Sequence, residues 1–197
     1  MDGLLVHTER QWLQAKKLLF ERHGHVLTDA DRAAVFGGAD LETTTYFAGR
    51  FGVDAEGIPD LRREYLDIVA GLFEAGIELT DGAARLVGRL RRTVPIALAS
   101  NTRRSLVDVV LAQTPFERSF GAIATGDEVP PKPAPDVYQL ACERLGVDPR
   151  SAVAVEDSPT GVKAARAAGL ACIGVPSDSS HPLTEADHRV ASLTELL

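Results

Sequence analysis

Hydrophobic and polar positions follow two different periods along the chain. In residues 10–76 the apolar positions recur every three or four residues with no strand alternation, which is typical of short amphipathic helices. Beyond residue 79, helical stretches alternate with short apolar runs, and this order predicts a parallel sheet with covering helices. We therefore expect an α/β protein whose core is formed by residues 1–9 and 77–197, with a small helical subdomain inserted at 10–76.

The inserted segment contains the sequence signals of four helices. Thr28 followed by Asp31 has the spacing of a capping box, and Pro59 suits a first helical turn. The expected helices are Gln11–Arg22, a short helix from Thr28 to the Gly37–Gly38 pair, Leu41–Arg50, and a helix from Pro59 to Gly76.

The core segment should supply four strands, several of which end in polar residues. The run Ala152–Val155 is apolar on both faces, as in a buried parallel strand. Parallel strands of an open α/β sheet gather their carboxyl ends at one edge, where ligands bind. The expected strands are Val94–Ser100, Phe120–Ala124, Ala152–Val155 and Leu170–Val175, and the expected helices are Gly82–Arg92, Ser105–Ala112, Asp136–Leu145 and Thr160–Ala168.

A hydroxyl, a lysine and a pair of acids follow these strands in order. They are Ser100 with Asn101, Lys132, and Glu156 with Asp157. Each has an ordinary alternative, because short polar residues and acids cap helices and a loop lysine is usually solvated. Together, however, hydroxyl and amide donors, an ammonium and carboxylates are what a phosphoryl group and a magnesium ion require.

Composition narrows the choice of partner and location. The 197 residues are 45% apolar, enough for one α/β domain with a modest insertion, and the net charge of -7 argues against nucleic acid or an anionic membrane as partner. No apolar run reaches membrane-spanning length and no signal peptide opens the sequence, so we expect a cytoplasmic protein. Cys142 and Cys172 are expected to be core residues rather than a disulfide.

Considered jointly, these motifs resemble the haloacid dehalogenase-like hydrolase superfamily, in its phosphatase and β-phosphoglucomutase-like branch with a small helical cap. The resemblance implies that Asp2, in Met1-Asp-Gly, is the general acid/base and a metal ligand rather than an acid at a frayed terminus. It also implies that Ser100 and Asn101 bind the phosphoryl group, together with the catalytic Lys132.

The same resemblance implies that Glu156 and Asp157 bind Mg²⁺ with Asp2, and that residues 10–76 are the cap that reads the leaving group. The expected reaction is Mg²⁺-dependent hydrolysis of a small phosphomonoester, such as a sugar phosphate, through an aspartyl-phosphate. Two alternatives stay open: a sugar phosphomutase, and an inactive protein that binds a phosphorylated ligand. We expect a monomer whose partner is a small phosphorylated metabolite, with no nucleic acid and no membrane.

Two departures from the family pattern occur at the start of the sequence. His7 stands where the family usually has a short polar or acidic residue, and the nucleophilic aspartate of the first motif would precede Met1. We therefore expect that the chain is truncated, that Met1 is an internal methionine, and that the first core strand is missing. Such a chain should fold poorly and form no aspartyl-phosphate.

Overall fold

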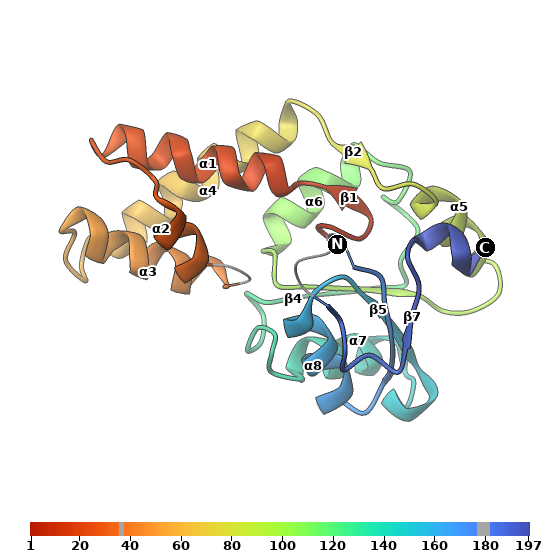
Figure 1. Ribbon diagram of the computed structural model, residues 1–197. Coiled ribbons are helices and arrows are strands. Elements are labelled where there is room, and N and C mark those ends of the chain that lie inside the picture. The colour runs from red at the N-terminus through yellow and green to blue at the C-terminus, as the bar shows by residue number, and fades with distance from the viewer. Residues whose placement is uncertain (36–37, 177–181) are drawn as a thin grey trace. The chain divides into compact units, whose positions relative to one another are not determined.

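The computed structural model describes residues 1–35, 38–176 and 182–197. The chain divides into two compact units (Figure 1). The first, here the core unit, contains Met1–His7 and Ile77–Leu197, and the second, here the helical unit, is Thr8–Gly76.

The described residues of the helical unit, 8–35 and 38–76, form four helices, as the periodicity predicts. Its buried aromatic side chains pack edge to face, with the rings of Phe20 and Phe47 centred 5.0 Å apart and those of Phe47 and Tyr65 5.9 Å apart. The helices are α1 (Glu9–Arg22), α2 (Asp29–Ala34), α3 (Asp40–Phe51) and α4 (Ile58–Glu74). The second helix ends earlier than expected, at Ala34, and the expected terminal residue Gly37 lies outside the described residues.

The buried carboxylate of Asp31, on α2, accepts hydrogen bonds from the residue that caps α2 and from two side chains of α3. Asp31 is 1% exposed, and its Oδ2 accepts from the Thr28 amide at 2.9 Å and the Thr28 hydroxyl at 2.6 Å. Its Oδ1 accepts from Tyr46 Oη at 2.8 Å and Arg50 Nε at 2.7 Å. The Thr28 side chain accepts in turn from the Asp31 amide, which completes the predicted capping box.

The core unit alternates strands and helices in the predicted order. The strands are β1 (Val6–His7), β2 (Glu78–Leu79), β3 (Ala97–Ser100), β4 (Ala122–Thr125), β5 (Val153–Glu156), β6 (Ala171–Gly174) and β7 (His188–Arg189). The α-helices are α5 (Ala83–Leu90), α6 (Arg104–Ala112), α7 (Asp136–Leu145) and α8 (Pro159–Ala167), and the 3₁₀ helices are η1 (Pro149–Ser151) and η2 (Leu193–Leu196).

Three small sheets are formed by the described strands. β1 pairs antiparallel with β2, β3 pairs in parallel with β4, and β5, β6 and β7 form a parallel sheet in that order. Leu98 lies opposite Ile123 in the second sheet, and Ala154 lies opposite Cys172 in the third. The expected α/β fold with parallel strands is confirmed, and its parallel strands are divided between two sheets.

Helices cover both faces of these strands. On one face, Ala154 of β5 and Cys172 of β6 pack against buried residues of α7 and α8. On the other, Val155 and Ile173, from the same two strands, pack with residues of α5, α6 and η2. Since successive strand side chains point to opposite faces, one short strand contributes to both halves of the core. The core unit is therefore a sheet layer between two helical layers.

The sequence pattern does not predict the short antiparallel pair β1 and β2, and it is wrong at two further places in the core unit. The pattern predicts a buried Val153, but this residue is 60% exposed at the first position of β5. β7 was expected to be part of a polar tail, yet His188 and Arg189 pair with β6. A two-residue polar strand has no hydrophobic alternation by which it could be recognised.

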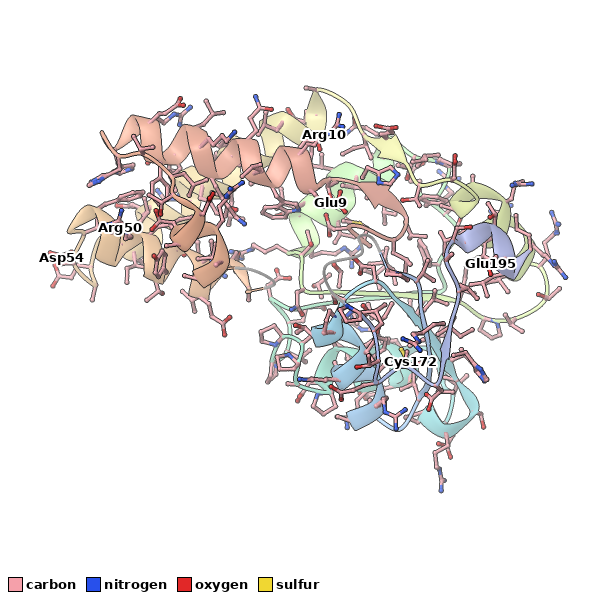
Figure 2. All side chains as sticks on the ribbon, viewed as in Figure 1. Glu9, Arg10, Arg50, Asp54, Cys172 and Glu195 are labelled. Atoms are coloured by element: carbon pink, nitrogen blue, oxygen red, sulfur yellow. The ribbon has the colours of Figure 1, made fainter. Side chains whose placement is uncertain are left out.

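Cys142 and Cys172 are both buried and free, as expected of core residues, and Figure 2 labels Cys172. Among the described helices, none combines the length and the apolar character that crossing a membrane requires.

Candidate active site

The end of β3 is joined to the loop that carries Lys132. Asn101 follows β3, and its Nδ2 donates to the Lys132 carbonyl at 3.0 Å while its Oδ1 accepts from the Lys132 amide at 2.7 Å. This pair of hydrogen bonds fixes the backbone from which the lysine side chain extends. Because the Asn101 side chain is engaged in this way, a contact from Asn101 to a phosphoryl group would come from its backbone N–H.

The Lys132 ammonium connects the carboxyl ends of β3 and β5. Its Nζ donates to the Ala99 carbonyl at 3.0 Å, to Glu156 Oε1 and to Tyr138 Oη at 3.4 Å. The Lys132 side chain is 9% exposed and that of Glu156 is 6% exposed. Lys132 is therefore a buried, paired cation, and the alternative of a solvated loop lysine is wrong.

Burial and neighbouring charges shift the pKa values of Glu156 and Tyr138. Burial by itself would raise the pKa of the Glu156 carboxyl, but the adjacent Lys132 outweighs burial and the pKa is lowered. The Tyr138 hydroxyl donates to Glu156 Oε1, and burial together with the negative charge of Glu156 raises the pKa of Tyr138 well above its usual value. Glu156 is thus ionised at neutral pH, and Tyr138 remains a hydrogen-bond donor.

The first turn of α8 leaves room for the Glu156 carboxylate only because residue 161 is glycine. A Cβ atom built on Gly161 would lie 1.9 Å from Glu156 Oε2, well inside contact distance. The helix is capped by Ser158, whose Oγ accepts from the Gly161 amide at 3.1 Å and lies 3.4 Å from Glu156 Oε2. The alternative in which Glu156 and Asp157 merely cap this helix is therefore wrong.

Asp2 and Ser100 meet at Thr102. The Thr102 hydroxyl donates to Asp2 Oδ2 at 2.7 Å, and the Thr102 amide donates to Ser100 Oγ at 3.1 Å. Ser100 is 4% exposed, and Asp2 forms a bridge with Val6. Asp2 is thus held in the structure, and its carboxylate lies next to the segment that follows β3.

The pKa of the Asp157 carboxyl is also perturbed. Burial raises its pKa to about 6, with a further increase from Glu156 that is opposed by the Met1 amine and Lys132. The first residues of the chain contact the segment after β3, through Asp2 and Thr102. Hydrogen bonds thus link Asp2 with the end of β3, and the end of β3 with Lys132 and the end of β5.

Two of the three carboxylates expected to bind Mg²⁺, those of Asp2 and Asp157, are suited to hold the ion. Across residues 1–35, 38–176 and 182–197, no group of three or more histidine, cysteine, aspartate or glutamate side chains is placed to hold a metal ion. Mg²⁺ usually keeps several waters and takes one or two carboxylates together with a substrate phosphate. Asp157, a partly buried acid whose ionisation is disfavoured, suits this role, and Asp2 is the second candidate ligand. Glu156 is engaged with Lys132.

The sequence analysis does not identify three residues that contact the expected site residues. Tyr138, Thr102 and Gly161 were not singled out as site residues, although the first is part of the Lys-Pro-Ala-Pro-Asp-Val-Tyr segment and the second follows Ser100-Asn101 directly. Each of the three lies within six residues of an expected site residue, and this closeness in sequence is the signal that could have found them. What distinguishes them is a tertiary contact.

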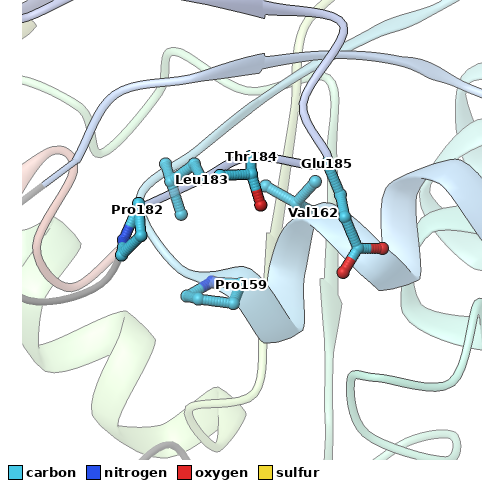
Figure 3. A pocket seen from close by; sticks show the side chains of 6 residues that line it. All are labelled: Pro159, Val162, Pro182, Leu183, Thr184 and Glu185. Atoms are coloured by element: carbon cyan, nitrogen blue, oxygen red, sulfur yellow. The ribbon is translucent and has the colours of Figure 1, made fainter.

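A separate shallow hollow lies beside the start of α8 (Figure 3). None of the expected site residues lines it. Its lining consists of Pro159, Val162, Pro182, Leu183, Thr184 and Glu185.

Comparison with known proteins identifies the family. The model of the haloacid dehalogenase-like hydrolases matches residues 1–169. The chain belongs to this family, and the enzyme is a phosphatase-type hydrolase, as the resemblance of its motifs implies.

Relatives and solved structures agree with this assignment. The chain is 28% identical over 199 residues to validoxylamine A 7′-phosphate phosphatase of Streptomyces hygroscopicus subsp. limoneus, covering 100% of this chain and 92% of the relative. The crystal structure of CbbY from Rhodobacter sphaeroides in complex with phosphate has a TM-score of 0.88 and 31% identity, covering 100% of this chain and 93% of that one. A variant of CbbY in complex with xylulose 1,5-bisphosphate gives a TM-score of 0.88 and 30% identity over the same shares.

Proposed function

We propose that the protein hydrolyses a small phosphomonoester, with a sugar phosphate or a similar polyol phosphate as the substrate class, in a reaction that depends on Mg²⁺. The observation that carries this proposal is the buried Lys132 ammonium, which donates to the Ala99 carbonyl, one residue before Ser100, and to Glu156, one residue before Asp157. A fixed cation next to hydroxyl and amide donors suits the charge of a phosphoryl group in transfer. The names of the relatives, which include a sugar-like phosphate and a sugar bisphosphate, support the substrate class.

The residues take distinct parts in the proposed reaction. Ser100 and the backbone of Asn101 bind the phosphoryl oxygens, and Lys132 offsets their negative charge. Asp2, oriented by Thr102, protonates the leaving oxygen and then takes a proton from the attacking water. The phosphoryl group passes through an aspartyl-phosphate before water releases it.

Magnesium would be held by Asp2 and Asp157, with waters and the substrate completing its shell. When bound, the ion supplies positive charge to the phosphoryl oxygens. Asp157 then stays ionised at neutral pH, because a cation next to a carboxyl lowers its pKa. The helical unit is proposed to be the cap that selects the leaving group.

The test is an assay of the full protein, as its gene encodes it, against a panel of sugar, polyol and nucleoside phosphates. Inorganic phosphate and isomerised phosphosugar are measured separately, with Mg²⁺ and with a chelator. Release of inorganic phosphate that requires Mg²⁺ supports the proposal. Isomerisation of a phosphosugar without net release would show a phosphomutase, and binding without turnover would show a phospholigand-binding protein.

A further inference from the structure

A tyrosine that the family motifs leave unassigned lies against both ionised groups of the site. Tyr138, on α7, is 7% exposed, and its hydroxyl donates to Glu156 Oε1 and accepts from Lys132 Nζ at 3.4 Å. The Lys132 ammonium also lies over the tyrosine ring, 4.7 Å from its centroid. Tyr138 therefore contacts the cation in two ways, through its oxygen and through the face of its ring.

The contacts of Tyr138 determine how the lysine is oriented. An ammonium has three hydrogens, and Lys132 directs them to the Ala99 carbonyl, the Glu156 carboxylate and the Tyr138 hydroxyl. Ala99 belongs to β3 and Glu156 to β5, so these two contacts set the ammonium between the strands. The tyrosine is the third contact and the only one of the three made through a side chain from a helix.

The hydroxyl also limits the freedom of Glu156. A buried carboxylate with a single cationic partner can rotate toward that partner, whereas a second donor on the same oxygen fixes its plane. Tyr138 supplies that second donor on Oε1, while Gly161 and Ser158 lie against Oε2. A phenylalanine would fill the same volume and leave one buried acceptor short of a donor.

The geometry points to Tyr138 as a positioning residue that holds the Lys132 ammonium and the Glu156 carboxylate in the arrangement that receives a phosphoryl group. This inference rests on the proposed function for the identity of the ligand, but the positioning of Lys132 can be measured without any ligand. The two statements can therefore be tested separately.

Three variants separate the contributions of the tyrosine. Tyr138→Phe removes the hydroxyl and keeps the ring under the ammonium, and Tyr138→Leu removes both. Thr114→Val is the matched control, because it deletes another buried hydroxyl of the core unit, one that donates to the Leu111 carbonyl at 3.2 Å. Tyr138→Phe loses two buried hydrogen bonds and Thr114→Val loses one, so the control shows how far the loss of a buried hydroxyl by itself loosens the core.

The first measurement is the rate at which an acylating reagent modifies Lys132, followed by peptide mass spectrometry on the unliganded protein. We expect Tyr138→Phe to raise this rate about fivefold, as loss of one hydrogen bond to a charged group allows, and Tyr138→Leu to raise it further. Thr114→Val should leave the rate within twofold of wild type. A Lys132 rate in Tyr138→Phe that matches the control would overturn the inference.

The second measurement is the affinity for inorganic phosphate in the presence of Mg²⁺, by calorimetry. Tyr138→Phe should weaken binding about tenfold with a melting temperature close to that of Thr114→Val. Equal affinity in Tyr138→Phe and wild type would contradict a role in receiving phosphate. Absence of phosphate binding in the wild type would instead contradict the proposed function, and the acylation rates would still decide whether Tyr138 positions Lys132.

Discussion

The side chain of Asn101 is hydrogen-bonded at both ends to the backbone of Lys132. Nδ2 donates to the carbonyl at 3.0 Å and Oδ1 accepts from the amide at 2.7 Å, across 31 positions of sequence. The end of β3 thereby sets the place from which the lysine reaches Glu156. A residue expected to contact the phosphoryl group serves first to hold another residue of the site.

Asn101→Ala should lower both stability and phosphate affinity. Two backbone groups of Lys132 lose their partner, which costs about 1–3 kcal/mol in the free energy of unfolding, measured by urea denaturation. Affinity for inorganic phosphate with Mg²⁺ should fall at least fivefold, because the ammonium is no longer fixed. Gln11→Ala is the control, since it removes one exposed side-chain bond to the Gly76 carbonyl in the helical unit. Phosphate binding as tight in Asn101→Ala as in this control would refute the role of the pair.

Two glycine-to-alanine substitutions should have opposite effects on stability. In Gly161→Ala the new Cβ would overlap the Glu156 carboxylate, so the variant should lose about 1–3 kcal/mol and bind phosphate more weakly. In Gly88→Ala, on α5, a Cβ meets nothing within 4 Å, and the gain in helix propensity should stabilise the protein by about 0.5–1 kcal/mol. Urea denaturation measures both. A Gly161→Ala variant as stable as the wild type would show that Glu156 does not need the space above Gly161.

The helical unit should lose stability in acid through Asp31. Burial by itself would raise the pKa of this carboxyl, but its bonds to Thr28, Tyr46 and Arg50 outweigh burial and the pKa is strongly lowered. A carboxyl whose folded pKa lies below its unfolded value, about 3.9, contributes stability above that value and loses it as the pH falls toward the folded pKa.

We therefore expect Asp31→Asn to cost about 2–3 kcal/mol at pH 7 and to flatten the decline in stability between pH 5 and pH 2. The measurement is the urea midpoint at a series of pH values. Asp29→Asn, in the same helix, is the control, because the Asp29 side chain is 90% exposed in its pair with Arg32 and should change stability very little. Equal acid sensitivity of wild type and Asp31→Asn would contradict the assignment.

The parts of the fold that are local in sequence could be predicted, and the parts that depend on distant contacts could not. Four helices in the helical unit and the capping box at Thr28 follow from periodicity and spacing over a few residues. The polar strand ends could be grouped because parallel strands share one edge. By contrast, Thr102 reaches Asp2 across 100 positions and Tyr138 reaches Glu156 across 18, and no local pattern encodes either contact.

Asp157 follows β5 directly, and we expect phosphate release to depend on a Mg²⁺ ion that this carboxylate holds. The most direct measurement is the rate of inorganic phosphate release by the full protein as a function of Mg²⁺ concentration, for wild type, Asp157→Asn and the control Asp108→Asn, an exposed acid paired with Arg104. Asp157→Asn should retain the melting temperature of the wild type to within a few degrees and lose at least a hundredfold in turnover at saturating substrate, because an amide binds the ion more weakly than a carboxylate. Asp108→Asn should keep full activity. Turnover by Asp157→Asn equal to that of the wild type would contradict a role of Asp157 in holding Mg²⁺. Phosphate release by the wild type that persists in a chelator would contradict the dependence on Mg²⁺ itself.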